Sequence, residues 1–146
     1  MFKQTLLASV LFASVMAHGE SIPSVVPLAK TMNPAFASDY ANARVKVFAS
    51  FIAATPSEGY LWNSIPPDVM QGRAGFRISP PGEVAPAFPN VPIHAFIDKS
   101  KADILFSLQQ GEQIAVVGHP YIGEKLGLKQ VIFVAESVER VPPSKK

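Results

Sequence analysis

Aromatic and cationic side chains are concentrated in the middle of the chain, and these residue types suit ligand binding better than catalysis. The candidate residues are Tyr60, Trp62, Arg73, Phe76, Arg77 and His94. Aromatic rings stack on nucleobases, contributing ~1 to 3 kcal/mol per base, and a groove of cations follows the phosphates of a single strand. The same rings also suit packing in a core or at a protein interface. These residues predict a ligand-binding surface and leave open whether the ligand is a protein, a small molecule or a nucleic acid.

A second candidate group lies in the segment GHPYIGEKLG, residues 118–127. His119, Tyr121 and Lys125 stand there in a polar stretch bounded by glycines, where we expect the loop between the last two strands. In a small binding barrel this loop lies at the rim of the ligand cleft. A tight solvated hairpin would have a similar composition, so these three residues are secondary candidates.

Motifs for catalysis are missing from the sequence. There is no Gly-x-Ser-x-Gly elbow, no phosphate-cradling glycine loop and no His-Glu-x-x-His motif. The chain has no cysteine, and its three histidines, His18, His94 and His119, show no metal-ligand spacing. We therefore expect no catalytic residues, no metal and no cofactor, although a catalytic role of His94 and His119 remains a testable alternative.

The N-terminal residues 1–19 have the pattern of a secretory signal peptide. Lys3 precedes an apolar run over residues 5–16, and small residues allow cleavage after Ala17 or Gly19. The run is too short for a transmembrane helix, which needs ~20 apolar residues. An amphipathic or core helix is the alternative. The pattern predicts an exported, periplasmic or secreted protein without a membrane span after cleavage.

The charge balance is nearly neutral. The chain has 13 Lys and Arg against 11 Asp and Glu, so loss of Lys3 with residues 1–19 leaves 12 against 11. A protein that holds nucleic acid through phosphates usually carries a basic excess on one face. The balance therefore favours a protein or small-molecule ligand over a nucleic acid.

The elements that must position these side chains are mostly short strands. Residues 20–42 contain three prolines and predict an extended arm, because proline removes a backbone donor. Alternating apolar residues predict a first strand over residues 43–53, and a second strand begins at Tyr60 after a turn. Seven prolines between residues 66 and 92 predict an insertion that carries one short strand at residues 72–79.

The second half of the chain predicts strand, helix, strand and strand. Residues 93–98 alternate as a third strand, and a helix capped by Ser100 and Asp103 runs to Gly111. Two further strands follow at residues 113–118 and 130–138, and residues 142–146 form a tail. The predicted domain of residues 43–141 is all-β with a small α contribution.

The helix-to-strand junction LFSLQQGEQIAVVGH resembles that of secreted bacterial OB-fold families and tRNA-anticodon-like OB domains. The matching residues are Leu105, Leu108, Gly111, Glu112, Ile114, Val116 and Gly118. The resemblance implies a five-stranded OB-type barrel with one helix between strands three and four, here with the proline-rich insertion between strands two and three. It also implies a ligand face on strands two and three.

These observations together predict an exported, non-enzymatic OB-fold module. We expect it to recognise a protein or small-molecule partner in the cell envelope on its strand two and three face. The alternative is an OB domain that binds single-stranded nucleic acid through the same aromatic and basic residues.

Overall fold

The computed structural model describes residues 22–55, 64–82 and 93–143. Its elements in chain order are β1 Ser24–Val25, α2 Leu28–Thr31, α3 Ala37–Tyr40, β2 Val45–Thr55, α4 Pro67–Met70, β3 Arg73–Ser79, β4 Ile93–Asp98, the 3-10 helix η1 Lys99–Phe106, β5 Gln113–Lys125 and β6 Leu128–Arg140. Within this part of the chain no helix is long and apolar enough to cross a bilayer.

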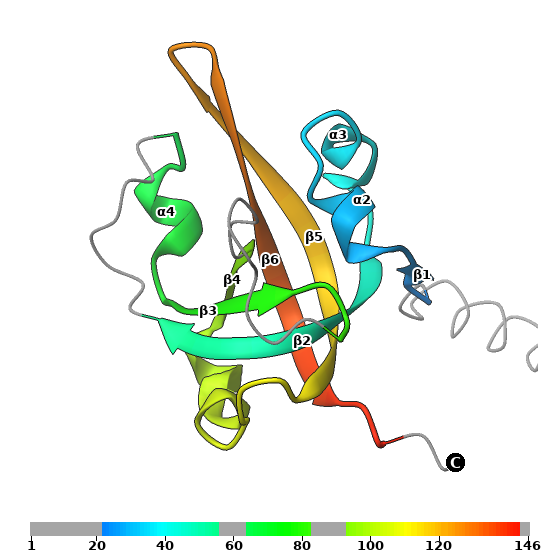
Figure 1. Cartoon of the computed structure of the whole chain (residues 1–146). Helices are drawn as coiled ribbons and strands as arrows, with labels where there is room; N and C mark the ends of the chain where they lie inside the picture. Colours follow the sequence, from blue (N-terminus) through cyan, green and yellow to red (C-terminus); the bar gives the residue numbers. More distant parts are fainter. Residues whose placement is uncertain (1–21, 56–63, 83–92, 144–146) are drawn as a thin grey trace, which may run out of the picture.

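Five strands close into a barrel. The sheet order is β1-β2-β3-β4-β6-β5, and β5 pairs back onto β2. All barrel neighbours are antiparallel except β4 and β6, which are parallel. With η1 between the third and fourth barrel strands, this is the predicted OB-type barrel, and the predicted fold class is confirmed (Figure 1).

Two β-bulges let long strands bend around this small barrel. β2 pairs with β5 over its first half and with β3 over its second, and its register shifts between Phe51 and Ala53. β5 shifts register against β6 between Val117 and Gly118. A Cβ atom on Gly118 would lie 2.0 Å from the carbonyl oxygen of Val134, so only glycine fits where the two backbones meet.

The barrel interior is filled by the inward-facing apolar side chains of all five strands, and both ends are plugged. Leu105 and Leu108 enter the core from η1 and the turn after it, whereas Val26 and Leu28 enter from the N-terminal segment. The segment with α2 and α3 lies beside β5, far from η1 in the view (Figure 1). Residues 20–42 were predicted to be an extended arm. Their described part instead forms the short helices α2 and α3, because isolated apolar residues such as Val26 and Leu28 pack into the barrel core.

The second barrel strand is β3 and not the segment beginning at Tyr60. β3 pairs with both β2 and β4 along its length, so the stretch predicted as a strand within the insertion is part of the barrel itself. Residues 60–63 lie outside the described residues. The prediction of an insertion rested on the many prolines of residues 66–92. These prolines flank β3 at residues 66–67 and 80–81 and do not interrupt it.

The last two strands are longer than predicted, because the expected loop of residues 118–127 belongs to them. β5 continues to Lys125 and β6 starts at Leu128, and they are joined through Leu126 and Gly127. The helix cap also differs. The N-cap is Asp98, whose Oδ1 accepts hydrogen bonds from the backbone N–H and the hydroxyl of Ser100 at 2.9 and 2.8 Å.

Candidate nucleic-acid interface

The outer face of β3 and β4 carries the polar side chains that the sequence singled out. Inward residues of β3 belong to the core, so Arg73, Gly75 and Arg77 alternate onto the outside. On β4 the outward residues include His94 and Phe96. The register places Arg77 directly opposite His94 and Gly75 opposite Phe96. The structure thus brings Arg73, Arg77 and His94 onto one face.

Phe76 does not belong to this face. Its side chain has no exposed surface and lies in the barrel core with Ile78 and Ala95. The alternation of β3 that points Arg77 outward points Phe76 inward. The prediction of Phe76 as a ligand-binding residue is therefore not supported by its position, since a ligand could reach the ring only by opening the barrel.

A second apolar cluster covers the centre of the outer face. Phe96, Ile132 and Val134 project from β4 and β6, and Ile65 packs on them from the segment before α4. Val69 and Met70 of α4 complete the cover. α4 stands to one side of the barrel, beyond β3 and β4 (Figure 1). Phe96, an outward aromatic residue in the middle of the face, is consequently buried.

Polar contacts hold this cover in place. Arg73 Nη1 donates a hydrogen bond to the carbonyl oxygen of Val69 in α4. The hydroxyl of Ser64 donates to Oε1 of Gln130 on β6 at 2.7 Å. The Ser64 backbone passes so close to β5 that a Cβ atom on Gly123 would lie 2.2 Å from its carbonyl oxygen. Arg73 therefore acts here as a positioning residue for α4.

Arg77 and His94 form the part of the outer face that this cluster leaves half-exposed. Nε of Arg77 is buried and has no hydrogen-bond partner among the described residues. Burial and the nearby positive charge of Arg77 lower the pKa of His94 below its usual 6.5. At pH 7 the pair consists of a permanent cation and a neutral imidazole, which can donate and accept hydrogen bonds.

His119 lies one strand beyond the cluster, on β5. It is half-buried and sits opposite Val134 on the outer face. The pKa of His119 is lowered from its usual 6.5, chiefly by burial. The negative charge of Glu136 acts in the opposite direction, and the positive charge of Arg73 lowers the pKa further. Glu136 also accepts a hydrogen bond at 2.8 Å from Nε of Arg44. His119 therefore lies on a strand near the Arg44–Glu136 ion pair and not in a loop at the rim of a cleft.

The remaining predicted residues divide into three cases. Tyr121 lies on β5 opposite Ile132 and packs partly buried against the second cluster. Lys125 is exposed at the end of β5, where the hairpin turns. Tyr60 and Trp62 lie outside the described residues. The structure thus keeps Tyr121 at the edge of the face and separates Lys125 from Arg77 and His94 along the hairpin.

Three residues that cover the face, Ile65, Val69 and Met70, are not among the residues predicted from the sequence. Their spacing was a possible signal, since an isoleucine and then a Val-Met pair after two prolines give a short helix an apolar side. Among the residues described, no group of three or more His, Asp or Glu side chains could hold a metal ion. The geometry supports reversible binding of an anionic or planar ligand at Arg77 and His94.

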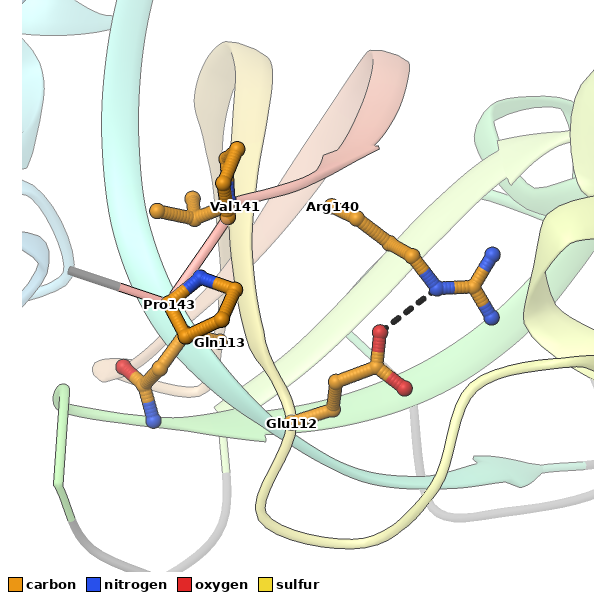
Figure 2. A pocket seen from close by; sticks show the side chains of 6 residues that line it. Glu112, Gln113, Arg140, Val141 and Pro143 are labelled. Atoms are coloured by element: carbon orange, nitrogen blue, oxygen red, sulfur yellow. Dashed lines mark hydrogen bonds and ion pairs between the residues drawn. The ribbon is translucent and has the colours of Figure 1, made fainter. Parts of the chain in front are cut away.

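An open pocket at the far end of β5 and β6 is a separate feature. Its lining residues are Glu112, Gln113, Arg140, Val141, Pro142 and Pro143. Figure 2 shows the ion pair on one side of it, in which Nε of Arg140 lies 2.6 Å from Oε2 of Glu112. Arg140 also donates to the carbonyl oxygen of Ser107. These bonds connect the end of η1 to β6 and use the guanidinium, so none of the described lining residues is a free cation.

Comparisons with known proteins return structures but no sequence relative. No family model and no curated protein matches the chain. The S. pombe Stn1–Ten1 complex matches at 14% identity and a TM-score of 0.40, covering 68% of this chain and 58% of that one. Yeast Stn1 and Ten1 match at 11% identity and a TM-score of 0.48, covering 84% and 82%. The chain spans less than two thirds of the matched S. pombe chain.

Both matched structures are of Stn1 and Ten1, and neither is described as a secreted bacterial protein. The comparisons therefore do not support membership of a secreted bacterial family. The predictions of an exported binding module, a protein or small-molecule partner in the cell envelope, and periplasmic or secreted localisation are wrong. The residues behind the resemblance, such as Leu105 and Leu108, only pack the barrel, and such residues carry no information on compartment. The signal-peptide pattern in residues 1–19 lies outside the described residues.

Proposed function

We propose that this chain is a non-catalytic OB-fold domain that binds single-stranded nucleic acid on the outer face of β3 and β4. The observation that carries the proposal is the cross-strand pair of Arg77 and His94, with Nε of Arg77 unpartnered among the described residues. A buried guanidinium N–H without an acceptor is unfavourable, so a rotation of this half-exposed side chain that brings its donors to a phosphate or base oxygen would be favourable.

Each member of the pair has a distinct part in this proposal. Arg77 supplies a fixed positive charge and a fork of donors that matches a phosphate. His94, neutral at pH 7 because its pKa is lowered, supplies a planar ring that can stack on a base and a donor–acceptor pair for a base edge. One charge and one ring suit a short stretch of a single strand.

The cover formed by Ile65, Val69 and Met70 limits the size of this surface. With Phe96 buried beneath it, the ring most central to the face cannot stack on a base. We therefore expect affinity in the micromolar range, carried by few phosphate contacts. Salt dependence should be correspondingly shallow, with a slope of roughly −0.7 per phosphate contact for a single strand.

The test is fluorescence anisotropy of a labelled single-stranded oligonucleotide at several salt concentrations. Arg77→Gln should weaken binding roughly 5- to 10-fold and reduce the salt slope by ~0.7, the share of one phosphate contact. Lys30→Gln is the matched control, because it removes one exposed positive charge on α2, away from β3 and β4. This variant should leave affinity within about twofold of the unmodified protein.

Three results would count against the proposal. The first is no binding at low salt, and the second is binding that does not change with salt. The third is an equal loss in the Arg77→Gln and Lys30→Gln variants, which would indicate a general effect of net charge. Thermal unfolding of both variants checks that neither loss comes from a destabilised barrel.

A further inference from the structure

The β5–β6 hairpin extends beyond the barrel as a two-stranded ribbon. β2 pairs with β5 only as far as Gly118, and β4 pairs with β6 only over residues 133–135. The strands then continue together until the pair of Lys125 and Leu128. In Figure 1 the hairpin tip stands clear of every other labelled element. The residues at this tip are therefore not required to close the barrel.

The tip exposes two leucines, Leu126 and Leu128, and the backbone conformation at Leu126 is unfavourable for leucine. Leu126 is 93% exposed and Leu128 is 76% exposed. Leu126 has φ of +54°, the only positive φ of a non-glycine residue in the described part of the chain, and Gly127 follows at +78°. Two successive positive φ values define a hairpin turn in which Asn-Gly is the preferred pair. A leucine here gains no burial and adopts a conformation that costs energy.

Lysines flank these leucines on both strands. The tip reads Lys125, Leu126, Gly127, Leu128 and Lys129, a symmetric arrangement of two apolar side chains between two cations. Lys125 is opposite Leu128, and Lys129 is opposite Glu124. The tip thus combines a small apolar end with two lysines and one carboxylate, a net charge of +1 over residues 124–129.

We propose that this tip inserts into the headgroup region of an anionic lipid bilayer, with the leucines entering the interface and the lysines meeting lipid phosphates. Lysines placed beside apolar side chains are the common signature of such contacts. A protein interface is the less suitable occupant, because two leucines at the end of a narrow ribbon offer a small fraction of the ~800 Å² per partner that a stable interface buries. This inference does not depend on the proposed nucleic-acid function.

The test is sedimentation of the protein with vesicles of phosphatidylcholine alone or of phosphatidylcholine with roughly one third phosphatidylglycerol. We expect binding to the anionic vesicles only. The double variant Leu126→Asn with Leu128→Thr should reduce it more than 10-fold, since both leucine contacts are lost. Lys125→Gln with Lys129→Gln should reduce it roughly 5-fold or more.

Two controls separate this surface from general stickiness. Phe106→Ser removes another exposed apolar side chain, 82% exposed on η1, and should leave vesicle binding unchanged. The double leucine variant should keep or slightly raise its melting temperature, because Asn suits the turn and Thr suits a strand. It should also keep its oligonucleotide affinity, which distinguishes failure here from failure of the proposed function.

Several outcomes would overturn the inference. These are absence of vesicle binding, equal binding to neutral and anionic vesicles, and full binding by the double leucine variant. A wild-type dimer that the double leucine variant converts to a monomer would assign the tip to a second copy of the chain instead.

Discussion

Replacement of Gly118 by alanine should strongly destabilise the barrel. The added Cβ would lie 2.0 Å from the carbonyl oxygen of Val134 and 2.9 Å from Cα of Ala135. Both are backbone atoms of the central strand β6, which β4 and β5 hold from either side. Relief of the overlap therefore requires β5 and β6 to separate by more than 1 Å at the bulge, whereas an overlap with a flexible side chain would need only a rotation.

The size of the effect follows from what this separation breaks. About two ladder hydrogen bonds beside the bulge would be lost, at ~1 kcal/mol net each. Overpacking of a tight site adds ~1 to 3 kcal/mol. We expect the free energy of unfolding to fall by ~3 to 5 kcal/mol, a large share of the 5 to 15 kcal/mol that is usual for a domain. The melting temperature should fall by roughly 10 to 20 °C.

Urea denaturation followed by circular dichroism measures this change, with Gly123→Ala as the matched control. A Cβ on Gly123 would lie 2.2 Å from the carbonyl oxygen of Ser64, a comparable overlap. Ser64 lies outside the barrel ladder, so relief of this overlap would break the Ser64–Gln130 hydrogen bond and shift Ile65 but leave the strand pairing intact, and this variant should lose ~2 kcal/mol or less. A loss below 1 kcal/mol for Gly118→Ala, or a larger loss at Gly123 than at Gly118, would refute the reasoning.

Three further predictions concern separate parts of the fold. Leu126→Asn should stabilise the protein by ~0.5 to 1 kcal/mol, measured as a rise in melting temperature, because asparagine tolerates the positive φ. Folding lowers the pKa of His94, so the unfolded state binds more protons at acid pH. The free energy of unfolding should therefore be constant above pH 6.5 and decrease as the pH falls below it, and this decrease should be smaller in His94→Gln. In a double-mutant cycle, Arg140→Gln and Glu112→Gln should show a coupling of ~0.2 to 1 kcal/mol, because the pair is partly exposed.

The barrel was predictable because its signals are local. Alternation in residues 43–53 and 93–98 predicts strands that the structure places at Val45–Thr55 and Ile93–Asp98, and a helix between the third and fourth strands limits the topology to few choices. The leucines and Gly111 at the junction also lie where the pattern places them: Leu105 and Leu108 are buried, and Gly111 has φ of +88°. These features depend on residues that are close in the sequence, so they can be predicted from the sequence alone.

Element limits were less predictable where distant contacts decide them. Nothing local shows that β5 continues through His119 and Pro120, since Pro120 and the flanking Gly118 usually indicate a turn and only pairing with β6 makes this segment a strand. The helix cap moved to Asp98 for a similar reason, since the end of β4 fixes where η1 begins.

The candidate site shows the same division. The sequence by itself determined that Arg77 and His94 are outward residues of strands, because each alternates with apolar neighbours. Only the tertiary structure decided that β3 and β4 are adjacent in a register that sets Arg77 opposite His94. It also decided that Phe76 is in the core and that Phe96 is covered by Ile65 and α4. The direction of a side chain follows from the local period of a strand, whereas its neighbours and its burial depend on residues far away along the chain.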